Sequence, residues 1–123
     1  MRPAVDIIDR GSVIVLPAEE RGRGRVRVAS PIRIRVGDRV FTIEAGFESD
    51  GSSVPWWARW RLDPWGRRGI PGIFHDWLLR ERLFSKRETD WLYLGALHAE
   101  GVADLEAVLM FLAVRTRDFP ATA

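Results

Sequence analysis

Hydrophobic and polar residues alternate in the first 47 positions and change to a helical spacing after residue 72. The alternating part, with turn residues between its segments, predicts four strands, at 12–16, 25–29, 32–36 and 39–43. The later part predicts three helices, at about 73–84, 86–100 and 103–117. The pattern therefore indicates an α+β fold, with a small N-terminal antiparallel β-sheet, a Pro/Gly/Trp-rich loop and a three-helix C-terminal part.

The strongest local signal in the β-rich part is a hairpin. Gly37 and Asp38 form a two-residue connection, which pairs Ile34 with Phe41 on one face of the sheet. Arg33 then lies on the opposite face. A sheet with one buried and one wet face follows from this register.

The second predicted helix has clear signals at both ends. Ser85 and Glu88 have the spacing of a capping box, in which each side chain accepts a hydrogen bond from a free backbone N–H group of the other residue. Gly101 is placed to end the helix. The connection to the preceding helix is so short that the two helices should pack antiparallel.

Length and composition indicate one domain over residues 1–123. We divide it into a β-rich part (1–47), a loop (48–72), a helical part (73–117) and a tail (118–123). The chain has no cysteine, which excludes disulfides and thiolate chemistry and favours a reducing compartment or a virion. We expect neither a signal peptide nor a transmembrane segment.

The basic residues give little support for nucleic-acid binding. The formal net charge is only +2, although 19 residues are basic and all but one of these are arginine. The cluster of Arg21, Arg23, Arg25 and Arg27 has two interpretations, a phosphate contact or a solvated strand face, and the second is favoured. We therefore expect nucleic acid to be an unlikely partner.

Two polar residues fall where the helices should be buried. His75 shares a helical stripe with Leu78, and Asp90 projects between Leu94 and Leu97 on the next helix. A buried carboxylate needs a partner, and antiparallel packing can bring Asp90 opposite His75. Such a His–Asp dyad can make the imidazole a general base, or it can be a hydrogen bond that only staples two helices.

Acidic residues close to the predicted dyad suggest a metal site. Asp76 follows His75 directly, and Asp50 precedes Gly51 in the loop. Two carboxylates and a backbone carbonyl near Gly51 are hard oxygen ligands of the kind that Ca²⁺ prefers. We therefore expect a Ca²⁺ ion held by Asp50, Gly51 and Asp76.

Three segments resemble a phage-associated family, the domain of unknown function 1353. The segments are GFESDGSSVP (46–55), FHDWLL (74–79) and SKRETDWLYLGAL (85–97). They are similar to that family's Asp-Gly-small-Ser-aliphatic-Pro segment, its His-Asp pair and its later Arg-x-x-Asp on a helix. The resemblance implies a phage or prophage origin, and it implies no established activity.

The same segments resemble, more distantly, the small secreted phospholipases A2 of prokaryotes and fungi. That resemblance implies that Asp50, the carbonyl of Gly51 and Asp76 bind Ca²⁺, that His75 activates water, and that Asp90 orients His75. It implies a calcium-dependent hydrolase acting on a lipid ester.

The loop between sheet and helices carries a mixture of tryptophan and arginine. Trp57, Arg59 and Trp60 have the composition of an interfacial or substrate-contacting surface, where indole rings lie at headgroup depth and arginine meets phosphate. The alternative is that the tryptophans close the core. The expected partners are thus a phospholipid or membrane surface, or phage structural proteins if the chain is a non-enzymatic assembly protein with a buried His–Asp staple.

Overall fold

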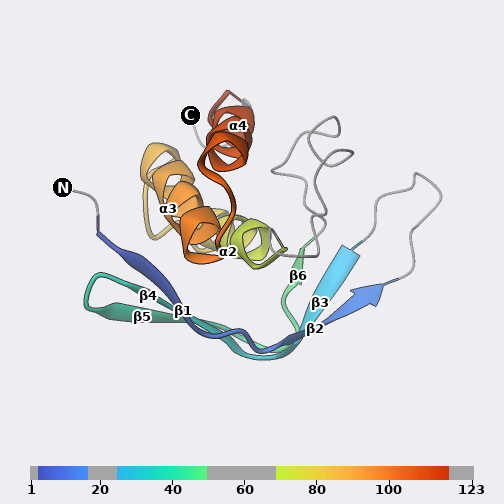
Figure 1. The fold of residues 1–123 in the computed structure, drawn as a ribbon. Coiled ribbons are helices and arrows are strands. Elements are labelled where there is room, and N and C mark those ends of the chain that lie inside the picture. The colour runs from blue at the N-terminus through green and yellow to red at the C-terminus, as the bar shows by residue number, and fades with distance from the viewer. Residues whose placement is uncertain (1–2, 17–24, 50–68, 117–123) are drawn as a thin grey trace.

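A computed structural model describes residues 3–16, 25–49 and 69–116 of the chain (Figure 1). The strands are β1 (Val5–Asp9), β2 (Ser12–Leu16), β3 (Arg25–Ser30), β4 (Ile32–Val36), β5 (Arg39–Ile43) and β6 (Glu48–Ser49). The helices are α2 (Gly69–Glu81), α3 (Lys86–Ala99) and α4 (Asp104–Arg115). The predicted α+β class, with strands before helices, is confirmed.

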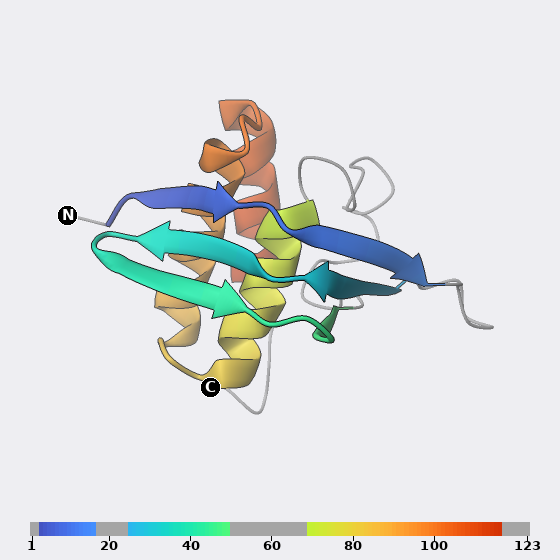
Figure 2. The ribbon, with the colours of Figure 1, turned by 90° about the horizontal axis from the view of Figure 1, so that it is seen from below.

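The strands form a bent layer of two antiparallel sheets, where the sequence had predicted one. One sheet has the order β1-β4-β5 and the other the order β2-β3-β6. Figure 2 shows that β1 leads into β2, and β3 into β4, at the same place along the layer. In Figure 1 the helices all lie on one side of this layer.

The bend between β1 and β2 depends on Gly11. Its φ angle is +57°, in the left-handed region that glycine adopts readily. A Cβ atom at this position would meet the carbonyl oxygens of Ser30 and Pro31, which lie at the corresponding bend between β3 and β4. The two bends are thus packed backbone against backbone, and only glycine allows it.

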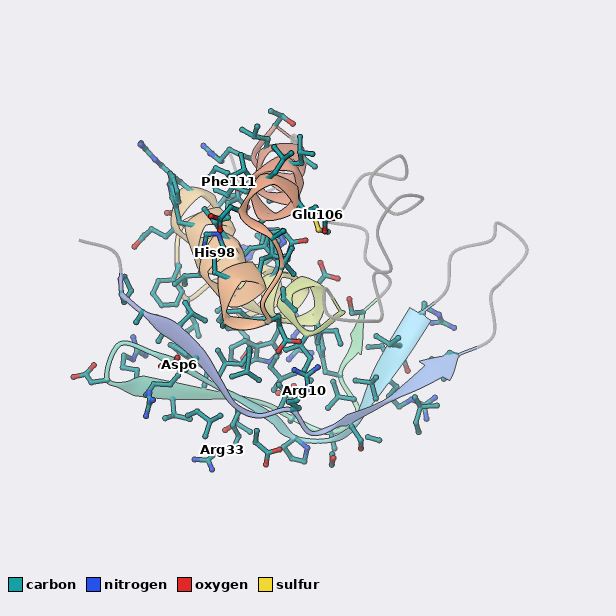
Figure 3. All side chains as sticks on the ribbon, viewed as in Figure 1. Asp6, Arg10, Arg33, His98, Glu106 and Phe111 are labelled. Atoms are coloured by element: carbon teal, nitrogen blue, oxygen red, sulfur yellow. The ribbon has the colours of Figure 1, made fainter. Side chains whose placement is uncertain are left out.

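The predicted hairpin is confirmed, both in the pairing of its residues and in which side chains point into the core. Ile34 pairs with Phe41, and both are buried, as are Ile32 and its partner Ile43. Arg33 is exposed and lies on the side of the sheet away from the helices, where Figure 3 labels it. One face of this sheet is therefore apolar and covered, and the other is wet.

Two strands were missed by the sequence pattern. β1 carries Asp6 between apolar residues and pairs with β4, with Asp6 opposite Arg35. β6 is only two residues long and lies within the segment predicted as loop. Both depend on pairing with distant strands, which no local pattern records.

Helix α2 begins at Gly69, four residues before the predicted start at 73. Pro71 and Gly72 were taken as loop residues, but Pro71 lies in the first helical turn, where the missing N–H group would have no intrahelical partner anyway. The helix also ends earlier than predicted, at Glu81, because Arg82 adopts a φ angle of +54°.

The capping box that opens α3 is confirmed. The Ser85 hydroxyl accepts a hydrogen bond from the backbone N–H of Glu88, and the Glu88 carboxylate accepts one from the backbone N–H of Ser85. Gly101 follows the helix end with a φ angle of +79°. α4 is slightly shorter at both ends than predicted, and the predicted tail, 118–123, lies outside the described residues.

The core has two parts that meet at α3. One fills the space between the strands and α2, and its large members include Ile34, Phe74 and Leu78. The other lies between α3 and α4, around Tyr93 and Leu97. Helix α3 therefore has buried residues in both parts. None of the helices that the structure describes is both long enough and apolar enough to cross a membrane.

Candidate functional site

His75 and Asp90 meet across the interface between α2 and α3. Each lies in the middle of a buried helix face, and the two helices run antiparallel because only residues 82–85 connect them. The Nε2 atom of His75 lies 2.6 Å from Oδ1 of Asp90, and neither side chain has any exposed surface. The structure thus brings together the two residues that the sequence predicted as a dyad.

The second carboxylate oxygen of Asp90 receives two cationic side chains. Nζ of Lys86 lies 2.7 Å from Oδ2, and Nη1 of Arg115 lies 2.9 Å from the same atom. Lys86 also donates to the backbone carbonyl of Val114, at 2.8 Å. The carboxylate therefore joins α2, α3 and the C-terminal end of α4.

These contacts determine the charge state of Asp90. Burial by itself raises the pKa of the Asp90 carboxyl group, because it removes water from the charged form. The hydrogen bonds from His75, Lys86 and Arg115 outweigh burial and hold that pKa below its ordinary value. Asp90 is therefore an ionised carboxylate at neutral pH.

An ionised partner fixes the roles of the two ring nitrogens of His75. A carboxylate can only accept hydrogen bonds, so Nε2 of His75 carries a hydrogen and donates it to Asp90. In the neutral ring, Nδ1 then has a free lone pair. Among the described residues, this buried Nδ1 atom has no hydrogen-bond partner. The ring of Tyr93 packs against the imidazole, with ring centroids 5.1 Å apart.

Asp76 directly follows His75 on α2 and lies next to β6. It is partly exposed, and its Oδ2 atom accepts a hydrogen bond from the hydroxyl of Ser49. Ser49 is buried and immediately precedes Asp50 in the sequence.

Only part of the predicted calcium site falls on described residues. Asp76 offers a carboxylate, whereas Asp50 and Gly51 lie outside the described residues. Within 3–16, 25–49 and 69–116, no group of three or more histidine, cysteine or acidic residues could hold a metal ion.

The sequence matches a family described as "Protein of unknown function (DUF1353)" over residues 26–114. The chain belongs to this family. The family resemblance inferred from the sequence motifs is thus confirmed. No curated protein and no solved structure matches the chain.

The part matched to DUF1353 contains the dyad but not every residue around it. It runs from β3 to the last turn of α4 and includes His75, Asp90 and Lys86. Arg115 lies one residue beyond its end, and β1 and β2 precede it. The helix pair that carries the dyad therefore lies within the family region.

Several predicted residues cannot be placed in this DUF1353 chain. Trp57, Arg59 and Trp60, predicted as an interfacial or substrate-contacting surface, lie outside the described residues. Of the arginine cluster, Arg25 and Arg27 are described, and both form ion pairs with Glu48. That pairing agrees with the interpretation of these two residues as part of a solvated strand face.

Sequence reasoning missed three residues of this site: Ser49, Lys86 and Arg115. A signal was present for Lys86, because it stands four residues before Asp90 on the same helix, the spacing at which side chains become neighbours. Arg115 and Ser49 reach the site from α4 and β6, and only the tertiary fold places them there.

Proposed function

We propose that this DUF1353 chain is a phage or prophage hydrolase of ester bonds, in which His75 is the general base and Asp90 is the residue that positions it. One observation supports this most: Nε2 of His75 donates to an ionised carboxylate, which leaves the Nδ1 lone pair free of any partner among the described residues. That is the tautomer a histidine needs to accept a proton from water.

In the proposed reaction, Nδ1 of His75 takes one proton from a water molecule. The oxygen of that water attacks the carbonyl carbon of the ester, and the carbonyl oxygen becomes an oxyanion. The carbon–oxygen ester bond then breaks, and the imidazolium returns its proton to the leaving alkoxide. Asp90 keeps the ring oriented throughout and offsets the positive charge that the ring carries between the two transfers.

We further propose that Ca²⁺ binds next to His75, through Asp76 together with Asp50 and the carbonyl of Gly51. Support comes from the partly exposed carboxylate of Asp76, which accepts a hydrogen bond from the hydroxyl of Ser49. Ser49 is the residue directly before Asp50 in the sequence. When bound, Ca²⁺ would supply a Lewis acid that stabilises the oxyanion. The oxygen-only donor set fits this hard cation.

The proposed substrate is a phospholipid or a related acyl ester. This rests on the resemblance of the dyad segments to phospholipases A2, and on Trp57, Arg59 and Trp60 as residues suited to a lipid surface.

A second candidate function is that of a non-enzymatic phage structural or assembly protein. Two observations favour it: the dyad has no exposed surface, and Lys86 and Arg115 already neutralise the carboxylate. Such a hydrogen-bond network would hold α2, α3 and α4 together and would catalyse no reaction. The two functions differ in one measurable respect, since only the hydrolase turns over an ester.

The test measures hydrolysis of phospholipid vesicles and of a soluble acyl ester, with Ca²⁺ and with a chelator. The Asp90→Asn variant presents an amide N–H₂ to Nε2, which moves the ring hydrogen to Nδ1 and removes the base. Its rate should fall by about 10³- to 10⁴-fold. Because the change also leaves two cations without a carboxylate, the double variant Lys86→Met/Asp90→Asn is measured beside it.

The matched control is Thr89→Val, at the residue before Asp90. Thr89 is also fully buried, and its hydroxyl has no hydrogen-bond partner among the described residues. This variant should fold and keep the wild-type rate. If the wild type hydrolyses neither substrate under any condition, the hydrolase proposal is wrong and the assembly function stands. If both Asp90 variants retain the wild-type rate, the roles assigned to His75 and Asp90 are wrong.

A further inference from the structure

Helix α4 contains an uncharged stretch that covers its whole circumference. Residues 107–114 read AVLMFLAV, between the acidic first turn with Asp104 and Glu106 and the basic last turn with Arg115. A helix that is apolar all round is normally buried on all sides. Among the elements that the structure describes, α4 is the outermost helix (Figure 1), and α3 is the one against which it packs.

The side of α4 that faces α3 accounts for five of these eight residues. Ala107, Met110, Ala113 and Val114 are buried in the core between the helices, and Phe111 packs on Trp91 with ring centroids 4.5 Å apart. Figure 3 shows Phe111 and Glu106 on opposite flanks of α4. The inner face of α4 is therefore complete without any further partner.

The outer face carries a stripe of four exposed apolar residues, which we call the α4 stripe. Its members and their exposed fractions are Leu105 73%, Val108 42%, Leu109 50% and Leu112 48%. Their spacing of three and four residues places them along one line of the helix. Together they expose apolar surface on the order of 300 Å², which is as much as the largest patch on many monomeric proteins.

The α4 stripe is complementary to itself in an antiparallel arrangement. Its midpoint falls between Val108 and Leu109, so a two-fold axis there sets Leu105 of one copy opposite Leu112 of the other. Val108 and Leu109 then meet their counterparts at the centre. Each stripe residue thus gains an apolar neighbour from the same set of four residues, as a closed two-fold interface requires.

The charges at the two ends of α4 fit the same arrangement. Asp104 and Arg115 are eleven residues apart, which at about 100° per residue places them on the same flank of the helix, within about 20° of each other. A two-fold antiparallel copy therefore brings Asp104 near the second copy's Arg115 at both ends. Within one chain Asp104 lies 3.5 Å from His98, and Arg115 binds Asp90 at 2.9 Å. The side chain of Asp104 is nevertheless 98% exposed and that of Arg115 37% exposed, so a second copy can approach both. In this antiparallel pair, the positive N-terminal end of each α4 helix dipole also lies beside the negative C-terminal end of the other.

We propose that the α4 stripe is the interface of a homodimer in which two copies of this chain pack α4 against α4, antiparallel. The inference is independent of the proposed hydrolase function. The apolar area is small beside the roughly 800 Å² that each partner buries in a standard interface. The dimer is therefore reversible, and it dissociates on dilution.

The test is analytical ultracentrifugation of the full chain from about 1 µM to about 1 mM, which brackets the dissociation constant expected for a small interface. Leu109→Lys places two like charges beside the two-fold axis and should make the chain monomeric over the whole range. An equal mixture of Leu109→Lys and Leu109→Glu chains should associate again, because opposite charges then meet at the axis. Circular dichroism verifies that each variant is folded.

Leu83→Lys is the matched control. Leu83 is 47% exposed, nearly the same as Leu109, but it lies in the connection between α2 and α3. Wild type and Leu83→Lys should dimerise alike. The proposal is overturned if the wild type stays monomeric at the highest concentration, if Leu109→Lys dimerises as the wild type does, or if the charge-paired mixture stays monomeric. A wild type that is monomeric but binds neutral phosphatidylcholine vesicles would assign the stripe to a lipid surface instead.

Discussion

Arg115 donates from Nη1 to Oδ2 of Asp90 at 2.9 Å, although 25 residues separate them in the sequence. The contact links the last turn of α4 to the carboxylate that holds His75. Lys86 strengthens the link, since it donates both to Asp90 and to the carbonyl of Val114. The imidazole is therefore oriented by a carboxylate whose own position depends on all three helices.

The two cations should differ in their contribution to stability. The side chain of Lys86 is 13% exposed and that of Arg115 is 37% exposed, so water screens the arginine more. We expect Lys86→Met to lower the free energy of unfolding by about 2–3 kcal/mol and Arg115→Met by about 1 kcal/mol. Urea unfolding measures both. Arg87→Met, at an exposed position of α3, is the control and should change little; an equal loss in all three variants would contradict the screening argument.

The acid sensitivity of the fold should depend on Asp90. Its pKa is lower in the folded chain than in the unfolded chain, where it is about 3.9. The stabilisation from Asp90 is therefore fully present above that value and is lost as pH falls through the lower, folded pKa. Urea unfolding at a series of pH values below about 5 should show a steeper loss for the wild type than for Asp90→Asn.

Glu44 provides the comparison for this pH dependence. Its pKa is also lowered, first by the hydrogen bond from Arg80, but its side chain is 54% exposed. Glu44→Gln should therefore flatten the acid slope less than Asp90→Asn does. A larger effect from Glu44 would mean that surface pairs, not the dyad, determine acid stability.

The bend of the strand layer should not tolerate a side chain at position 11. Gly11→Ala forces a Cβ atom against two backbone carbonyls at a positive φ angle, and should cost about 2 kcal/mol or more of the unfolding free energy. Gly72→Ala is the control, because a Cβ atom in this turn of α2 meets nothing within 4 Å. It should be neutral or slightly stabilising in a thermal melt. Similar melting temperatures for the two variants would contradict this account of the bend.

The sequence predicted those elements whose signals are local. The Gly37-Asp38 turn and the Ser85/Glu88 capping box determined the hairpin register and the start of α3, and both are as predicted. The start of α2 was misjudged because a proline is compatible with a first helical turn as well as with a loop. β1 was missed because its pairing with β4 is a long-range contact.

The candidate site was predictable to the same extent. His75 and Asp90 stood out because each interrupts an apolar helix face, and a short connection brings the two faces together. Lys86 could have been added from its i, i+4 spacing to Asp90. Arg115 could not, because only the packing of α4 on α3 brings it to the carboxylate.

The hydrogen position on the imidazole of His75 tests the central claim most directly. Nitrogen-15 NMR of the histidine rings distinguishes the two neutral tautomers, and the chain's only other histidine, the exposed His98, serves as internal reference. At mildly alkaline pH we predict that His75 carries its hydrogen on Nε2, with Nδ1 unprotonated, and that Asp90→Asn reverses this. A hydrogen on Nδ1 in the wild type would contradict the account.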